Sequence, residues 1–404
     1  MQGLKRVVFY ISFPFSFIAF IFPIYASSVG ASVIEIGLLY SMFSVVAILI
    51  RPIVGNIIDK KGRKKGIFIG VALYALVNIL YFLARDYKYL LIARILQSLA
   101  ASFLWISIDA SISDISNKEN RAKNFGILDQ VQVKGEFLGS IIGFNLLLTN
   151  SFSIFISNSF STVFLVFFIA SIISMYFAIK SVPETVGYKK DFEPGRLKGS
   201  KHTIYFLIAM GTISFVFSLT APIYLIYLKE NITNELFLIT WLFVPGAILA
   251  TFLPKKFGIL ADKHGREKVI VIGMFLTAIL QMFLPFVKSY YPFMVLYTLI
   301  SVAGMFYSPA MSSIIIDFVG EDKRGRSYGI YSFASGIGAA IGPLVGTYIY
   351  ENIGNSIVFY LKGSLLIIIL VLICYIYPKF KFAEGRYNGG ISVHSADYPQ
   401  NQIN

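Results

Sequence analysis

The feature that most limits the fold of this chain is a series of apolar stretches, each long enough to cross a membrane. A helix needs roughly 20 mostly apolar residues to span the hydrocarbon core of a bilayer. The stretches predict an all-α integral membrane protein with about twelve transmembrane helices, and they leave no room for a soluble catalytic domain. We therefore expect no enzyme activity. The stretches occupy residues 7–28, 34–57, 66–84, 89–113, 123–148, 158–180, 203–228, 235–254, 269–287, 291–316, 327–350 and 355–377.

The composition agrees with this interpretation. Only 14% of the residues are charged and 56% are hydrophobic, with a mean hydropathy of +0.73. A soluble domain carries about 25% charged residues.

The net charge of +14 is distributed as a topology signal and not as a nucleic-acid surface. Most Lys and Arg residues lie in connecting segments that are predicted to be on the same side of the membrane as the N-terminus. The opposite loops hold only Arg85, Lys88, Lys229 and Lys288. Since basic residues favour cytoplasmic loops, both termini are predicted to be cytoplasmic in a multi-pass plasma-membrane protein. Excess positive charge also suits contact with anionic lipid of the bilayer.

The second half of the chain repeats the first. The pattern Gly55, Asp59, Gly62, Arg63 recurs 203 residues later as Gly258, Asp262, Gly265, Arg266, and Asp114 maps to Asp317 at the same offset. Because each half has an even number of spans, both halves have the same orientation, as parallel repeats do. We predict an N-terminal six-helix bundle (1–181), a cytoplasmic linker (182–202), a C-terminal six-helix bundle (203–378) and a polar, disordered tail (379–404).

These residues also carry a family resemblance. The motif Gly55-x-x-x-Asp59-Lys60-x-Gly62-Arg63, its second copy, and Arg94-Ile-Leu-Gln97-Ser98 resemble signatures of the major facilitator superfamily, in particular its multidrug and metabolite efflux members. The resemblance covers about residues 7–377. It implies two bundles around a central cavity that opens alternately to each side of the membrane.

The repeated loop is interpreted as a conformational latch. Glycine permits the tight turn, and an acidic residue can neutralise the positive N-terminus of a neighbouring helix. The resemblance implies that Asp59 braces the halves against the 327–350 span and that Arg63 pairs with Asp114. The alternative is ordinary basic charge at the membrane surface. The latch candidates are Gly55, Asp59, Gly62, Arg63, Asp114, Gly258, Asp262, Gly265, Arg266 and Asp317.

Ionisable residues inside the predicted spans are candidates for ion coupling or substrate binding, because burying a charge in the bilayer is costly. In the 123–148 span, 100° per residue places Asp129, Gln132 and Glu136 on one face and Lys134 on another. Glu136 is nearest the membrane midplane, where substrate and ion sites usually lie. A carboxyl there could bind and release a proton. The alternative is a permanent pair with Lys134 or Arg94.

Arg94 and Asp109 in the 89–113 span complete the set of candidates, and the resemblance associates this Arg with coupling. Arg51 and Lys362 lie near span ends and are predicted to extend to the membrane surface.

Aromatic and glycine residues give weaker indications. Tyr224, Tyr227, Trp241 and Tyr307 are candidates to line the central cavity. Gly135, Gly139 and Gly143 resemble an antiporter motif, but Ser140 stands where that motif has proline, so close helix packing is the preferred interpretation.

No ATP-binding motif of the form G-x-x-x-x-G-K-[ST] is present, so transport should draw on an ion gradient, with H⁺ favoured, and need no cofactor or metal. The leading hypothesis is a monomeric secondary transporter that exports a small organic solute by proton-coupled alternating access. The first alternative is uptake of a sugar or organic anion, with Arg94 and Lys134 holding negative charge. A more distant alternative is a non-transporting membrane sensor.

Overall fold

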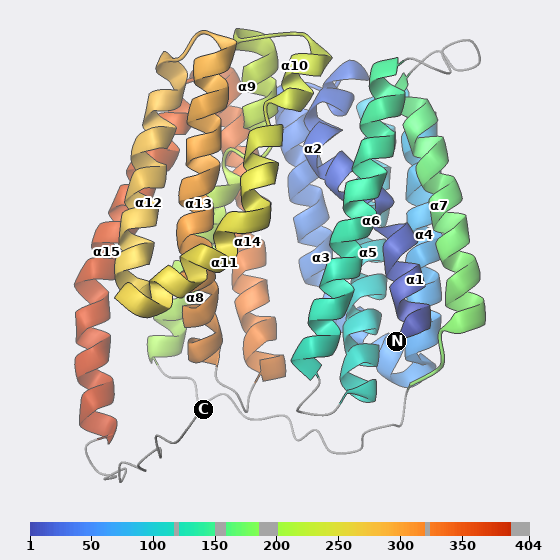
Figure 1. Ribbon diagram of the computed structural model, residues 1–404, viewed down its shortest axis with the longest axis horizontal. Helices are drawn as coiled ribbons and strands as arrows, with labels where there is room; N and C mark the ends of the chain where they lie inside the picture. The colour runs from blue at the N-terminus through green and yellow to red at the C-terminus, as the bar shows by residue number, and fades with distance from the viewer. Residues whose placement is uncertain (117–120, 150–158, 186–200, 320–323, 389–404) are drawn as a thin grey trace, which may run out of the picture.

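The computed structural model describes residues 1–116, 121–149, 159–185, 201–319 and 324–388. Two groups of helices stand side by side (Figure 1), and we use the upper and lower faces of that view throughout. The N-terminus lies at the lower face. The first half comprises α1 (Gln2–Ile11), α2 (Phe13–Ser28), α3 (Val33–Lys61), α4 (Arg63–Leu83), α5 (Tyr87–Ile115), α6 (Arg121–Thr149) and α7 (Ser159–Ser181).

The second half comprises α8 (Lys201–Ser218), α9 (Ile223–Asn231), α10 (Leu236–Trp241), α11 (Val244–His264), α12 (Arg266–Phe283), α13 (Tyr290–Val319), α14 (Arg324–Asn352) and α15 (Ile357–Asn388). A 3₁₀ turn at Leu284–Phe286 extends α12. α15 continues past residue 379, where the polar tail was predicted to begin. Of the predicted linker, 186–200 lies outside the described residues.

The prediction of an all-α membrane protein is confirmed. Among the described residues, ten helical segments are long and apolar enough to cross a bilayer, and Phe237–Ala250 with Phe252–His264 form an eleventh that is bent by 45°. The apolar helix Ile357–Leu372 corresponds to the last predicted span. The structure therefore has an apolar helix at each of the predicted stretches.

Three predicted spans are divided into two helices, which the sequence patterns did not predict. The divisions fall between α1 and α2, α8 and α9, and α10 and α11. Each has a proline within two residues of the second helix's start: Pro14, Pro222 and Pro245. Proline lacks the backbone N–H that would continue the helical hydrogen bonds, so it interrupts a helix at these points.

The glycine stripe of each half is a packing surface. A Cβ at Gly139 of α6 would collide with the backbone of Phe13, and a Cβ at Gly342 of α14 would lie 2.7 Å from the carbonyl oxygen of Phe215. Both contacts bring a long helix against the first span of its own half. The packing interpretation of these glycines therefore holds in both repeats.

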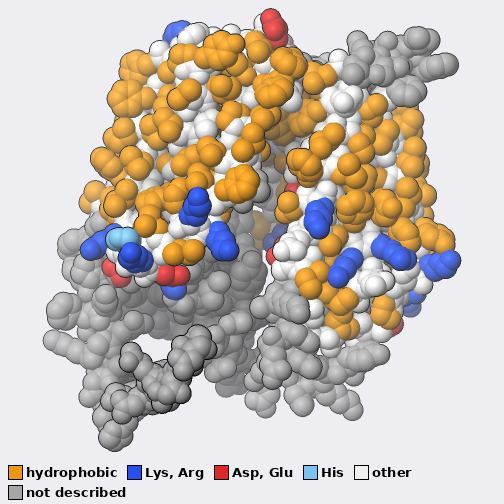
Figure 2. Space-filling view, viewed as in Figure 1, with side chains coloured by type: hydrophobic (Ala, Val, Ile, Leu, Met, Phe, Trp, Pro, Cys, Tyr) orange, Lys and Arg blue, Asp and Glu red, His pale blue; other side chains and the backbone are white. Residues whose placement is uncertain are grey.

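The outer surface suits a bilayer. Figure 2 shows a face covered mainly by hydrophobic side chains, with Lys and Arg gathered toward its lower part in both halves. Large apolar residues such as Leu49, Phe137 and Phe252 are exposed on the helices. An exposed apolar surface marks contact with a membrane or a partner, and the lengths of the apolar helices favour a membrane.

Candidate transport pathway

The two halves meet along the upper part of the molecule. The backbone N–H of Ile34 donates to Glu351 Oε2 at 2.9 Å, and Lys229 Nζ donates to Ser27 Oγ at 3.1 Å. The rings of Phe20 and Phe243 lie 4.0 Å apart between centroids. We call these contacts, together with the approach of α3 to α14, the upper seal.

Below the seal the halves separate. Figure 2 shows a hollow between them that reaches toward the lower face, with acidic and basic side chains along its lower part. Within the seal itself a smaller pocket of about 400 Å³ is lined by residues of both halves, among them Ile24, Ile36, Ile226 and Glu351. The structure is thus closed above and hollow below.

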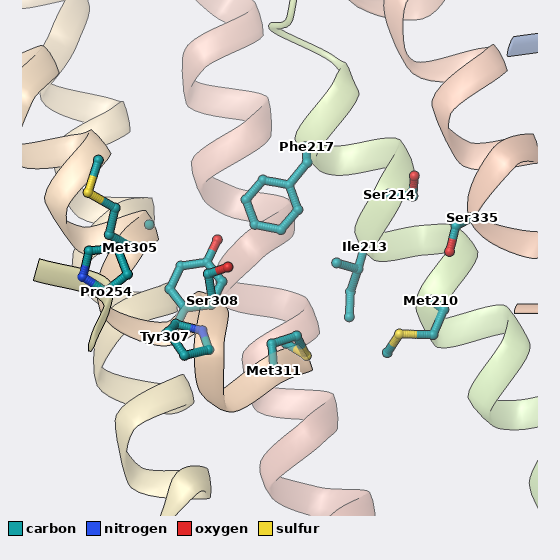
Figure 3. Close-up of a pocket in the computed structure, with 12 residues that line it drawn as sticks. Met210, Ile213, Ser214, Phe217, Pro254, Met305, Tyr307, Ser308, Met311 and Ser335 are labelled. Carbon is teal, nitrogen blue, oxygen red and sulfur yellow. The ribbon is translucent and has the colours of Figure 1, made fainter. Parts of the chain in front are cut away.

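A larger cavity of about 670 Å³ lies in the second half, between α8, α11, α13 and α14. Figure 3 shows the ring of Phe217 and three methionine side chains around the open space. Ligand cavities of this size are common, and flexible, polarizable methionine can adapt to differently shaped apolar ligands. The wall residues are Met210, Ile213, Ser214, Phe217, Pro254, Gly304, Met305, Tyr307, Ser308, Pro309, Met311 and Ser335.

The four aromatic candidates have different positions. They were predicted to line a central cavity between the halves, and Tyr307 lines the cavity of about 670 Å³ inside the second half. Tyr224 contributes its hydroxyl to a buried polar cluster described below. Tyr227 is fully buried against Phe293 and Phe359, so it belongs to the core and does not line the cavity. Trp241 is half exposed and packs beside Phe237, away from the cavity wall.

Glu136 lies at mid-length of α6 and is bound by neutral groups. Ser16 Oγ donates to Glu136 Oε2 at 2.6 Å, and Gln132 Nε2 donates to Oε1 at 2.8 Å. No ion pair joins Glu136 to Lys134, Arg94 or any other described residue. The face predicted for Gln132 and Glu136 is therefore present, and the permanent salt bridge of the alternative interpretation is absent from the described part of the chain.

A second group of charges lies lower in the first half. Asp109 of α5 is within electrostatic range of Asp129 of α6 and Arg51 of α3. Arg51 is exposed, as are Asp129 and Lys134. Three helices thus bring two carboxylates and one guanidinium into one region, and no sequence spacing indicated that Arg51 would join it.

Arg94 is buried in an aromatic environment. It is 7% exposed, and its guanidinium carbon lies 3.7 Å from the ring centroid of Phe22 and 4.9 Å from that of Tyr40. Arg94 Nη1 donates to Gln97 Oε1 at 2.9 Å, whereas its buried Nε–H has no partner among the described residues. The ring faces stabilise the cation in place of a carboxylate.

The predicted Arg63–Asp114 pair of the first motif copy is present at the lower face, within the first half, whereas the side chains at the start of α14 that Asp59 was predicted to meet lie outside the described residues. Arg63 Nε lies 3.3 Å from Asp114 Oδ2, and Arg63 also pairs with Asp59. Gly62 adopts φ 106°, a conformation that favours glycine, and reverses the chain between α3 and α4. Among the described residues, a Cβ at Gly55 would meet nothing within 4 Å, so Gly55 makes no close helix contact with that part of the chain.

Glu184 is a further member of this site that the motif did not reveal. Its carboxylate accepts hydrogen bonds from the backbone N–H groups of Arg63, at 2.8 Å, and Lys64, at 3.2 Å. The first N–H groups of a helix have no acceptor within the helix itself, and a negative charge is favourable at that end. Glu184 supplies both at the start of α4. Thr185 Oγ1 donates to Asp114 Oδ2 at 3.0 Å. The end of the first half is thereby tied to the latch.

The described residues include part of the second copy. Arg266 Nε lies 3.2 Å from Asp262 Oδ1 on an exposed surface, and Gly265 repeats the positive φ of Gly62. A Cβ at Gly258 would lie 3.8 Å from Pro309, an ordinary contact. The side chain of Asp317, the predicted partner of Arg266, lies outside the described residues.

Lys362 corrects one prediction. It was expected to extend to the membrane surface, but it is 5% exposed inside the second half. Its ammonium donates to Thr220 Oγ1 at 2.6 Å and lies 3.4 Å from the Tyr224 hydroxyl, which is hydrogen bonded to Gln281. We call Thr220, Tyr224, Gln281 and Lys362 the upper polar cluster. The sequence had indicated two of its members separately, Tyr224 as a cavity candidate and Lys362 as a charge near a span end, but no spacing indicated that they would meet.

Comparisons with known proteins agree with this architecture. A family model described as "Major Facilitator Superfamily" matches residues 7–254 and 206–391. The quinolone resistance protein NorA of Staphylococcus aureus is 24% identical over 358 residues, covering 87% of this chain and 90% of that protein. The multi-drug resistance efflux pump PmrA homolog of Lactococcus lactis is 25% identical, covering 84% and 85%. The crystal structure of the nucleoside transporter NupG superposes with a TM-score of 0.71 at 15% identity, covering 93% and 99%.

Proposed function

Because this chain belongs to the major facilitator superfamily, we propose that it exports small organic compounds from the cell in exchange for protons. The chain is a secondary transporter that spans the membrane several times and moves small molecules. The direction of transport and the coupling ion are the proposed part.

Export is supported by the relatives and by the cavity. Two curated relatives are named for quinolone resistance and for multi-drug efflux. The cavity of about 670 Å³ in the second half is lined mainly by apolar side chains, three of them methionine. Such a wall suits varied apolar compounds better than a single sugar, which needs many matched polar groups.

Proton coupling rests on Glu136. Its two carboxylate oxygens accept hydrogen bonds from Ser16 and Gln132, and no described cation neutralises it. A charge at this depth is costly, and binding a proton removes it. The two neutral donors can hold the ionised form as well. A group that tolerates both states can carry one proton per transport cycle.

The proposed cycle alternates between a state sealed at the upper face and a state closed at the lower face. The upper seal closes one side, while the hollow opens the other. If the lower face is cytoplasmic, as the Lys and Arg distribution predicts, the structure is open to the cytoplasm and sealed to the outside. In the alternate state, Asp59 would brace the lower side against the start of α14, while the Arg63–Asp114 pair, which is already formed within the first half, would hold the loop that carries Asp59 in place. The proposal includes a plasma-membrane location, cytoplasmic termini, a monomer, and no cofactor, enzyme activity or nucleic-acid partner.

Proton exchange in inverted membrane vesicles tests this function. A pH gradient is established, and a fluoroquinolone, ethidium or tetraphenylphosphonium is added. We expect at least one compound to dissipate the gradient with the wild-type chain and not with Glu136→Gln. Glu235→Gln, in an exposed segment of the upper face, is the matched control and should behave like the wild type.

Two outcomes would contradict the proposal. If none of a broad compound panel moves protons through the wild-type chain, export by proton exchange is rejected. If Glu136→Gln exchanges protons at the wild-type rate, Glu136 is not on the coupling path.

A further inference from the structure

The upper polar cluster holds a positive charge that has no acidic partner among the described residues. Lys362 is 5% exposed, and Thr220 and Gln281 are fully buried. No carboxylate lies within ion-pair distance of Lys362 in the described part of the chain. A buried, uncompensated ammonium is unfavourable, and such residues in a membrane protein mark functional sites.

The hydrogen-bond donors of the cluster outnumber its acceptors. Lys362 has three N–H groups, and its two partners are the Thr220 and Tyr224 oxygens. The Tyr224 hydroxyl is already engaged with Gln281 Oε1. The amide nitrogen of Gln281 is buried and has no acceptor among the described residues. Unmatched donors that converge on a cation are arranged for an anion.

The backbone beside the cluster is irregular. α8 ends at Ser218 and α9 begins at Ile223, so Thr220 lies in the break between them. Irregular backbone at membrane depth is tolerated where it is buried in protein or lines a cavity, and transporters bind substrates at such breaks. This observation is independent of the charge of Lys362.

One aromatic ring separates the cluster from the cavity. Lys362 Nζ lies 5.7 Å from the ring centroid of Phe217, and that ring stacks on Tyr307 at 6.1 Å. Phe217 and Tyr307 both line the cavity of about 670 Å³. Rotation of Phe217, which points into the space in Figure 3, would join the cavity to the ammonium.

We propose that the upper polar cluster binds the carboxylate of an organic acid whose apolar ring system lies in the adjoining cavity. Lys362 would supply the charge, while the Gln281 amide would donate to the second carboxylate oxygen. Acidic aromatic compounds are therefore a substrate class of this transporter. This inference deepens the proposed export function and rests on it for transport, although binding can be measured separately.

Equilibrium binding to the purified full-length chain in detergent tests the site. The probes are benzoate, naphthoate and anthracenecarboxylate, each paired with its neutral amide. We expect the best-bound acid to bind about 10-fold or more tightly than its amide, the factor expected for a charge-assisted hydrogen bond. Lys362→Met should abolish this preference, whereas Lys288→Met, at an exposed loop lysine, should leave it unchanged.

A second variant covers the case in which Lys362→Met does not fold. Gln281→Leu keeps the lysine but removes the unmatched amide, and it should reduce the preference for the acid several-fold. Equal binding of acid and amide across all three pairs in the wild type would overturn the proposal. So would a preference for the acid that survives in folded Lys362→Met, or one that stays at the wild-type value in Gln281→Leu.

The two proposals can fail separately. If the preference for the acid depends on Lys362 but no compound moves protons in vesicles, the anion site stands and proton-coupled export falls. If quinolones drive proton exchange while acids and amides bind alike, export stands and the anion site is rejected.

Discussion

Gly37 is a position at which the upper seal leaves no room for a side chain. It lies on α3 opposite α14, and a Cβ there would collide with the hydroxyl of Thr347 and lie 2.8 Å from the carbonyl oxygen of Pro343. The two helices belong to different halves. Gly37→Ala should therefore push the halves apart at the upper face and favour the state that is open there.

The size of the effect follows from what can move. Thr347 Oγ1 donates to the Pro343 carbonyl at 2.7 Å, so the hydroxyl cannot turn away without losing that bond. Overpacking of this kind costs about 1–3 kcal/mol. The higher helix propensity of Ala is present in both states and cancels. Since only the sealed state contains the collision, the ratio of sealed to open molecules should fall about 5- to 150-fold.

Cysteine labelling measures this ratio. Ile24 lines the pocket inside the upper seal and is 6% exposed, so Ile24→Cys in a Cys374→Ser background should react only when the seal opens. A membrane-impermeant maleimide is added to right-side-out vesicles. While open molecules are rare, the labelling rate should rise by the same factor. Gly246→Ala is the control, because a Cβ there would meet Ser301 at 3.8 Å, an ordinary distance.

The reasoning fails if Ile24→Cys is labelled at the same rate with and without Gly37→Ala. It also fails if Gly246→Ala accelerates labelling equally, because the effect would then come from alanine in a helix and not from the contact between halves.

Two further predictions concern stability in detergent. Gly139→Ala should lower the thermal unfolding midpoint, because an overpacking cost of about 1–3 kcal/mol exceeds the gain in helix propensity. Gly126→Ala, where a Cβ meets no described atom within 4 Å, should raise the midpoint slightly, and equal shifts would contradict the packing role. Asp114→Asn should cost about 1–3 kcal/mol, because the side chains of Asp114 and Arg63 are only 18% and 15% exposed. Asp262→Asn should cost less than about 1 kcal/mol, because the side chains of Asp262 and Arg266 are 67% and 39% exposed; a midpoint lowered more by Asp262→Asn than by Asp114→Asn would refute the ranking.

Much of the fold follows from local properties of the sequence. Hydropathy alone located a helix at each predicted span, because a bilayer needs a minimum length of apolar helix. The offset of 203 residues relates Gly139 to Gly342, and both occupy corresponding contacts in the structure. Helical periodicity also placed Gln132 and Glu136 on one face, where they are hydrogen bonded.

The breaks between helices and the partners of charged residues were less predictable. Three spans are divided at prolines, yet Pro52 and Pro343 lie within unbroken helices. A proline removes one donor, but neighbouring helices decide whether the chain bends or continues. Glu184 is similar: its segment reads as a polar linker, and only the arrangement of α3 and α4 brings it to the Arg63 amide.

Lys362 shows which property of a residue can be predicted from sequence and which requires the tertiary structure. The sequence places Lys362 close to the start of the last span, and a lysine near a span end is expected to extend its ammonium to the membrane surface. In the structure the ammonium instead meets Thr220 and Tyr224. Depth in the membrane is a property of one helix, and the sequence determines it. The direction of a side chain and the groups that receive it depend on helices distant in the chain, so tertiary structure alone decided where this charge lies.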